Sequence, residues 1–181
     1  MEKKIGLFWL RDDFRFIKNK GLIEATINHD QVVVFYLYKK VAYKNQEAQK
    51  WWLSKSLLNF QKQLSNLNIS LEIIETNSFK IFFDNLMREK DFTIYWNKVY
   101  EPDYLKFDEY LLGVFKNKNI PHKRYKGNTL NENDEIKKND GTPFKVFTPF
   151  WKTAERYYIE RVPSKEKIIK KCKKKINYFK N

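Results

Sequence analysis

The chain has 181 residues, 42% of them hydrophobic and 17% aromatic, and a net charge of +14. This length and composition suit one domain with a substantial core and exclude a disordered chain. The positive charge favours a polyanionic partner such as nucleic acid, but a lysine-rich, solvated surface produces the same excess.

Several protein classes are excluded by what the sequence lacks. No apolar run approaches the ~20 residues that cross a bilayer, and the first residues show no signal-peptide pattern, so we expect no membrane contact. The single cysteine, Cys172, excludes a disulfide framework and fits a reducing cytoplasm. The five glycines form no dinucleotide or P-loop fingerprint, and His29 and His122 have no partner at metal-ligand spacing. A self-contained hydrolase or metalloenzyme is therefore not expected.

Apolar runs at regular intervals predict the strands of a sheet. They are mostly continuous rather than alternating, which is typical of parallel strands covered on both faces. Four strong runs occupy residues 4–10, 31–38, 69–74 and 92–96, and a weaker fifth lies at 122–127.

Helical patterns separate these runs. The clearest is a stripe of apolar residues at steps of three and four from Leu53 to Leu67, and others lie at 78–90 and from Tyr104 onward. The alternation predicts a doubly wound α/β domain, with a five-stranded, mostly parallel sheet of Rossmann-like or flavodoxin-like type and helices on both faces. Ligands of such sheets bind at the carboxyl ends of the strands.

The loop after the first strand is rich in charge. Arg11 could present its planar donors to an anionic or polar ligand. Alternatively, Arg11 and Arg15 could form a network with Asp12 and Asp13 that only fixes the loop. We expect Asn19 to turn the chain into the next helix.

Two further segments carry candidate ligand groups. Trp51 and Trp52 cannot share the centre of one helical stripe, so we expect one to pack inward and the other to flank a cleft. The polar residues after the fourth strand either converge on a cleft ligand or cap the next helix. They are Asn97, Tyr100, Glu101 and Asp103.

The C-terminal part divides into an aromatic segment and a lysine-rich tail. Residues 144–151 hold three phenylalanines and a tryptophan, which either close the core or lead to another part of the protein. Residues 164–181 contain eight lysines and one glutamate, a composition typical of a mobile arm or linker, although interspersed apolar residues could dock. We therefore expect an α/β domain over 1–160 and a linker or tail over 161–181.

Four motifs follow one another in an order that identifies a family. The first strand runs into W-L-R-D-D-F-R at 9–15, and a later helix carries K-W-W-L at 50–53. W-N-K-V-Y-E-P follows at 96–102, and G-T-P-F-K-V-F-T-P-F-W at 141–151. Together they resemble the N-terminal domain of the DNA photolyase/cryptochrome family, in a form closest to bacterial class I deoxyribodipyrimidine photolyases.

The resemblance implies a division of labour between two domains. The α/β domain of the family binds an antenna chromophore, which passes excitation energy to FAD in a helical domain. There, light-driven electron transfer splits the cyclobutane ring of a pyrimidine dimer. The present chain ends at Asn181, ahead of such a domain, so we expect it to be inactive alone and to act as a carbon–carbon lyase on damaged DNA only within a full-length, monomeric protein.

The resemblance also implies an antenna site in the cleft between the ends of the first, second and fourth strands. Asp103-Tyr104 stands where folate-binding relatives have an Asn-Glu pair, and the antenna remains a choice among deazaflavin, folate and flavin. The expected roles are an anchor for Arg11, a wall for Tyr38 or Lys39, a charge partner for Lys50, and hydrogen-bond acceptors for Glu101 and Asp103.

Two other functions compete with photolyase. One is a cryptochrome-like or stand-alone module that binds a chromophore or a partner without lyase activity. The other is a basic nucleic-acid-binding domain whose charge is its main functional property.

Overall fold

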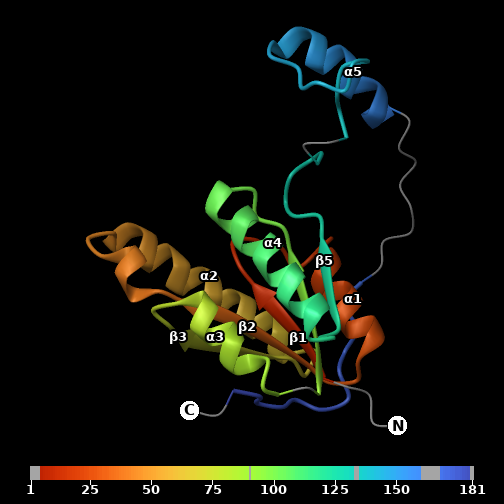
Figure 1. Ribbon diagram of the computed structural model, residues 1–181. Helices are drawn as coiled ribbons and strands as arrows, with labels where there is room; N and C mark the ends of the chain where they lie inside the picture. Colours follow the sequence, from red (N-terminus) through yellow and green to blue (C-terminus); the bar gives the residue numbers. More distant parts are fainter. Residues whose placement is uncertain (1–4, 90, 133–134, 160–167, 180–181) are drawn as a thin grey trace. The chain divides into compact units, whose positions relative to one another are not determined.

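The structure is a computed structural model that describes residues 5–89, 91–132, 135–159 and 168–179. It contains two compact units, described separately below (Figure 1). The α/β unit comprises Met1–Gly127 together with Lys167–Asn181, and the second unit comprises Asn128–Glu166. The boundary at 160/161 expected from the sequence stays a prediction.

The α/β unit is built on one parallel sheet of five strands in the order β3-β2-β1-β4-β5. All five predicted strands are present, and the predicted doubly wound fold is confirmed. The strands are β1 (Ile5–Leu10), β2 (Val32–Tyr38), β3 (Ser70–Glu75), β4 (Phe92–Asn97) and β5 (His122–Tyr125). The order reverses between β1 and β4, so their carboxyl ends form the topological switch point.

Helices cover both faces of this sheet (Figure 1). Alternate strand residues enter two separate cores: Phe8 and Leu10 pack with α1 and α2, whereas Leu7 and Trp9 pack with α3 and α4. The helices are α1 (Lys20–Asn28), α2 (Glu47–Ser65), α3 (Phe79–Leu86) and α4 (Pro102–Asn117), with a short 3₁₀ helix η1 at Lys40–Tyr43. None of the described helices is long and apolar enough to cross a membrane.

The helix starts follow local sequence. Asn19 caps α1 by accepting a hydrogen bond from Leu22 N, as the sequence predicted, and Ser78 caps α3 in the same way. Pro102 stands in the first turn of α4, where its fixed φ is favourable and its lack of an N–H costs nothing.

The two tryptophans of α2 both lie on the surface, so the expectation that one packs inward was wrong. Trp51 is 57% exposed and Trp52 is 67% exposed, with ring centroids 6.0 Å apart. The more buried position one turn before Leu53 is instead occupied by Lys50, whose side chain is 35% exposed.

Residues 168–179, here called the C-terminal strap, pack on the α/β unit. Ile169 and Cys172 are buried in the α1/α2 core, whereas Tyr178 and Phe179 pack against the α3/α4 core. The strap therefore passes the amino ends of β2 and β3 and joins the two cores. The described part of the lysine-rich tail thus docks on the α/β unit, as one of the two alternatives for the tail predicted. Residues 160–167 lie outside the described part of the chain.

The second unit contains the aromatic segment and α5 (Phe147–Ile159). Its aromatic rings contact one another: Phe147 stacks on Trp151 with centroids 6.2 Å apart, and Phe150 lies 6.3 Å from Phe144. Phe147 is 70% exposed within the structure. Pro149 lies in the first turn of α5, close to the helix start that the sequence predicted.

Candidate functional site

A buried ion pair stands at the switch point of the sheet. Arg11, directly after β1, donates from Nη1 to Asp108 Oδ1 at 3.0 Å and from Nη2 to Asp108 Oδ2 at 3.3 Å. Nη2 also donates to the carbonyl oxygen of Asn97 at the end of β4. The guanidinium lies over the ring of Trp9, 4.7 Å from its centroid. Burial lowers the pKa of Arg11, and the Asp108 carboxylate opposes that shift.

A second polar network joins the β1 loop to β4 and α1. The amide of Asn97 donates to Asn19 Oδ1 at 2.8 Å and to Asp13 Oδ2 at 3.2 Å. Its oxygen accepts a hydrogen bond from Gly21 N at 3.0 Å. Asp13 also accepts two bonds of 2.7 Å from Arg15.

These contacts favour the loop-fixing interpretation of the charged segment after β1. Arg11 and Asn97 are 5% and 4% exposed, and the amide of Asn97 and both Nη atoms of Arg11 are engaged by neighbouring parts of the fold, while Arg11 Nε has no hydrogen-bond partner among the described residues. The side chain of Asn97 is therefore directed into the fold, and the alternative in which it converges on a cleft ligand was wrong for this residue. The role of Arg11 as an antenna anchor stays a prediction.

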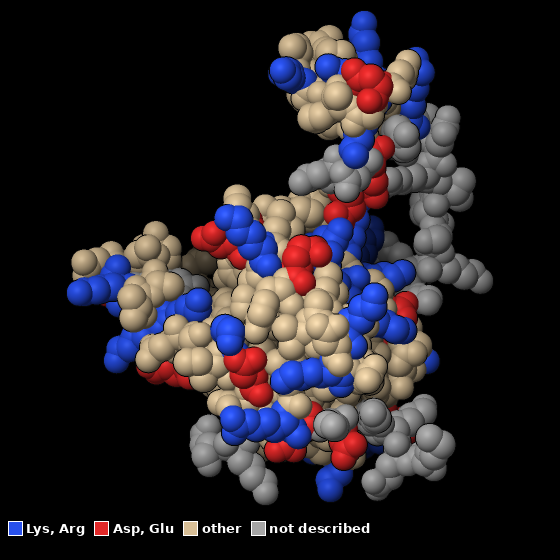
Figure 2. Space-filling view, viewed as in Figure 1, with Lys and Arg blue, Asp and Glu red and all other residues tan. Residues whose placement is uncertain are grey.

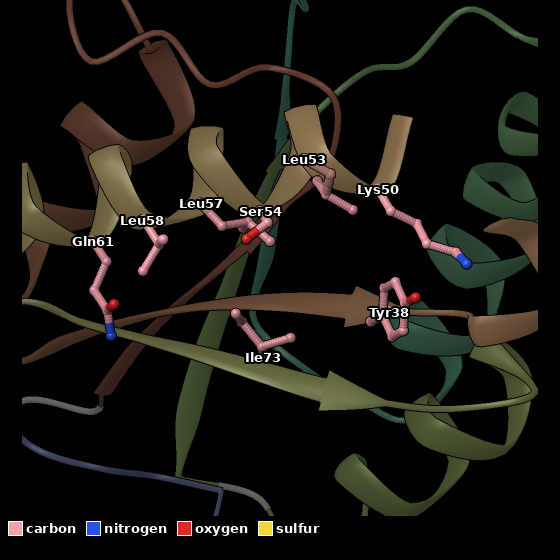
Figure 3. Close-up of a pocket in the computed structure, with 8 residues that line it drawn as sticks. All are labelled: Tyr38, Lys50, Leu53, Ser54, Leu57, Leu58, Gln61 and Ile73. Carbon is pink, nitrogen blue, oxygen red and sulfur yellow. The ribbon is translucent and has the colours of Figure 1, made fainter. Parts of the chain in front are cut away.

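An open pocket lies between α2 and the β2–β3 edge of the sheet (Figure 3). Its volume is about 310 Å³. Tyr38 and Lys50 stand at one end and Gln61 at the other, with leucines of α2 between them (Figure 3). The lining residues are Tyr38, Lys50, Leu53, Ser54, Leu57, Leu58, Gln61 and Ile73.

The structure brings together only some of the residues that the sequence assigned to one site. Tyr38 and Lys50 line the pocket, where Lys50 Nζ lies 2.6 Å from Glu47 Oε1. Lys39 turns to the other face, with Nζ 3.8 Å from the ring centroid of Phe79.

The two carboxylates assigned to the site lie on another helix. Glu101 is the N-cap residue of α4 without a side-chain capping bond, and Asp103 lies in the first turn. Both are exposed, and neither lines the pocket. Their role as chromophore acceptors stays a prediction.

The lining of the pocket fits a planar organic group better than a metal ion. Leucine and isoleucine side chains supply apolar contact, while the hydroxyls of Tyr38 and Ser54, the Gln61 amide and the Lys50 ammonium supply a few polar contacts. Among the residues that the structure describes, no group of three His, Cys, Asp or Glu side chains could hold a metal ion. Sequence reasoning missed Leu58 and Ile73, because their apolar side chains are 57% and 54% exposed beside the pocket instead of buried.

Comparison with known proteins agrees with the resemblance seen in the motifs. The deoxyribodipyrimidine photo-lyase of Agrobacterium fabrum is 27% identical over 149 residues, covering 82% of this chain and 31% of that protein. The photo-lyase of Alkalihalophilus pseudofirmus is 30% identical over 152 residues, covering 80% and 31%. Cryptochrome-1 of Arabidopsis thaliana is 25% identical over 150 residues, covering 81% and 22%.

Solved structures share the fold. A class III photolyase from Agrobacterium tumefaciens matches with a TM-score of 0.75 and 26% identity, covering 86% of this chain and 32% of that one. The cryptochrome of Synechocystis matches with a TM-score of 0.79 at 17% identity, covering 99% and 39%. The chain thus spans about a third or less of the curated relatives that it matches. Since residues 6–167 match the family described as DNA photolyase, the chain belongs to that family.

Proposed function

We propose that the chain is the N-terminal, antenna-binding part of a photolyase that repairs cyclobutane pyrimidine dimers in DNA under blue light. The observation that carries this proposal is the family match over residues 6–167, which includes the sheet apart from Ile5 and the pocket beside Tyr38. The curated relatives from Agrobacterium and Alkalihalophilus are named deoxyribodipyrimidine photo-lyases.

In this proposal the pocket between α2 and the sheet holds the chromophore ring. Leu53 and Leu57 would contact the ring faces, and Tyr38 would close the end nearest the switch point. Lys50 would pair with an anionic substituent in exchange for its contact with Glu47. A deazaflavin, folate or flavin bound there would supply absorption of blue light and transfer of its excitation energy.

Chemistry on DNA belongs, in the same proposal, to a longer protein that contains a flavin domain. The 181-residue chain alone would bind a chromophore without cleaving dimers, and damaged DNA would be the partner of the complete, monomeric, cytoplasmic protein. No described residue of the chain is assigned a catalytic step.

A cryptochrome-like role is the second candidate. It is favoured by the match to Arabidopsis cryptochrome-1, which covers 81% of the chain at 25% identity. In that case the complete protein would bind a chromophore and signal without repairing DNA.

One experiment separates the two candidates. The gene is expressed together with any reading frame that continues past Asn181, and the product is illuminated with blue light in the presence of DNA that carries cyclobutane dimers. Light-dependent loss of dimers is the expected result. Flavin binding without any repair would reject the photolyase proposal and favour the cryptochrome-like one.

A further inference from the structure

The C-terminal strap is held in a defined course along the sheet. Cys172 N donates to Leu67 O at 2.8 Å, and Lys173 N donates to Asp30 O at 3.0 Å. Further on, the Glu72 carboxylate accepts hydrogen bonds from the backbone of Tyr178 and Phe179 at 2.7 and 2.9 Å. These bonds fix the backbone along this path and therefore the side of the strap from which each side chain projects.

Most apolar side chains of the strap pack inward, whereas its lysines and Ile168 are exposed. Ile169 and Cys172 are 7% and 4% exposed and belong to a core, and the aromatic rings of Tyr178 and Phe179 contact Phe92 and Phe35. The lysines between them are exposed: Lys170, Lys171, Lys173, Lys174 and Lys175.

Within the described part of the chain, Asp30 is the acidic residue that forms an ion pair with one of these lysines, while Glu89 and Asp91 lie near Tyr178. Lys173 Nζ pairs with Asp30 Oδ2 at 2.9 Å, and Lys175 Nζ lies 3.5 Å from the neutral Ser65 Oγ. Glu72 is occupied by the strap backbone. Elsewhere on the α/β unit, the view in Figure 2 shows lysine and arginine interspersed with aspartate and glutamate. The strap is therefore a local concentration of positive charge.

The strap crosses the amino ends of β2 and β3, away from the Tyr38 end of the chromophore pocket, whose other end at Gln61 lies one turn of α2 before Ser65. It contacts Asp30, ahead of β2, and Asn68 and Ser70, at the beginning of β3. Tyr38, at the far end of β2, lines the pocket. A ligand on the strap lysines is therefore expected to leave the Tyr38 end of the pocket accessible.

We propose that the exposed lysines of the strap bind the phosphate backbone of duplex DNA, as a second and sequence-independent contact surface. The proposal rests on the proposed function in one respect, that DNA is the polyanion the protein meets. Residues 170–175 span at most ~20 Å when extended, which is enough to reach several phosphates of one strand.

Duplex is favoured over single-stranded DNA by the direction of the aromatic rings. Binding to single strands depends on exposed aromatic side chains on which bases stack. The strap packs Tyr178 and Phe179 against the core, and its exposed side chains are mostly lysines, with Ile168 and Asn177 but no aromatic ring among them. Such a surface recognises phosphates and not bases.

The test compares two triple variants of the 181-residue chain that remove the same charge. Lys170→Gln, Lys171→Gln and Lys174→Gln change the strap, whereas Lys106→Gln, Lys116→Gln and Lys118→Gln change exposed lysines on or next to α4. Fluorescence anisotropy with an undamaged, labelled duplex is measured over a series of salt concentrations. We expect the strap variant alone to bind at least tenfold more weakly at low salt. Its slope of log K against log salt should fall by roughly 2–3, since each phosphate that a lysine neutralises adds about 0.9 to that slope.

Equal losses of affinity in both variants, or none in either, would overturn the proposal. It would also be overturned if the strap variant bound duplex normally but no longer bound vesicles that contain phosphatidylserine. If the triple strap variant melts at a lower temperature than the unchanged chain, the comparison is repeated with two single variants. These are Lys174→Glu on the strap and Lys118→Glu next to α4. Undamaged DNA in the dark makes this readout independent of repair, so a failed repair assay would reject the proposed function and leave the strap result standing.

Discussion

Asp108 on α4 and Arg11 after β1 form a two-bond ion pair that is closed to solvent on both sides, with side chains 0% and 4% exposed. The two residues are 97 positions apart in the chain. Their pairing fixes the exit of the central strand against the helix that follows β4, so it sets the geometry of the switch point.

Removing the carboxylate should destabilise the α/β unit strongly. Asp108→Asn leaves the buried guanidinium of Arg11 without its counter-charge, and a broken buried pair costs about 3–5 kcal/mol. Urea unfolding would measure the decrease in the free energy of unfolding.

The neighbouring Glu109 provides a matched control for the removal of a carboxylate. It is 69% exposed and pairs with Arg124 at 3.0 Å, so Glu109→Gln should cost less than about 1 kcal/mol. Replacing both buried charges, as Arg11→Met with Asp108→Leu, should recover much of the stability. Equal costs for the two single variants would contradict the structural role assigned to the buried pair.

Two glycines in helices should respond in opposite ways to alanine. A Cβ at Gly21 would stand 2.6 Å from Asn97 Oδ1 and 2.7 Å from the Phe8 ring, so Gly21→Ala must displace the network at the switch point. A Cβ at Gly113 would meet nothing within 4 Å. Gly113→Ala should therefore raise the free energy of unfolding by about 0.5–1 kcal/mol, because alanine restricts the unfolded chain more than glycine does.

Thermal unfolding of the two variants checks this prediction. A higher melting temperature for Gly113→Ala and a lower one for Gly21→Ala are expected. A higher melting temperature in both variants would contradict the close contact between Gly21 of α1 and Asn97.

The sheet could be predicted from the sequence because β1, β2 and β4 are nearly continuous apolar runs separated by helical patterns, which is typical of a parallel sheet buried on both faces. The motif W-N-K-V-Y-E-P marked the right segment, but residue type alone did not show that Asn97 turns inward to Asn19 and Asp13. Long-range partners decide that direction.

Periodicity was least informative where a side chain has both polar and apolar parts. Lys50 takes the half-buried position on α2, and Trp51 and Trp52 remain on the surface, although burial tendency alone ranks tryptophan above lysine. The lysine-rich tail likewise docks through Ile169, Cys172, Tyr178 and Phe179, whose spacing follows neither helix nor strand periodicity.

The end of the strap should depend on one carboxylate. Glu72→Ala removes the acceptor of the Tyr178 and Phe179 N–H groups, and hydrogen bonds to a charged group contribute about 1.5–3 kcal/mol each. Amide hydrogen exchange at both positions should therefore accelerate roughly tenfold or more.

The effect should be local, because Cys172 N keeps its bond to Leu67 O. Its protection is expected to stay unchanged in the same experiment. Glu75→Ala, an exposed position on the same strand, is the control and should alter neither site. Faster exchange in that control would indicate a general loosening of β3.

Alkaline pH should weaken the fold. Burial, with Glu89 and Asp91 nearby, raises the pKa of Tyr178 to about 12, and burial, with Tyr125 and Glu24, raises that of Tyr95 to about 12. In the unfolded chain these phenols ionise near pH 10. Between pH 10 and 12 the unfolded state therefore binds fewer protons, so the free energy of unfolding falls as pH rises.

Urea unfolding at a series of pH values measures that slope. Tyr178→Phe and Tyr95→Phe should each flatten it above pH 10, and their effect on stability should not vary with pH near neutrality. Burial also raises the pKa of the Cys172 thiol, so the decline should begin near pH 9 and be delayed in Cys172→Ala. An unaltered slope in all three variants would contradict this account.

Chromophore binding should depend on the pocket beside α2. Tyr38→Ala removes the wall at the end of β2, and Lys50→Ala removes the ammonium at the mouth; each should weaken binding of a deazaflavin, folate or flavin about tenfold, or ~1.4 kcal/mol. Lys55→Ala, on the same helix but outside the pocket lining, is the control and should bind normally. Titration followed by chromophore fluorescence measures the affinities.

Variants of the exposed carboxylates Glu101 and Asp103 at the start of α4 test whether the chromophore site extends beyond the α2 pocket. The double change Glu101→Ala with Asp103→Ala should weaken binding as well, because the sequence assigns both groups to the chromophore. Unchanged affinity in that variant, with weaker binding after the changes at Tyr38 and Lys50, would confine the site to the α2 pocket. Weaker binding in the α4 variant alone would instead remove the pocket from the site, since its two polar end groups would then make no contact with the chromophore.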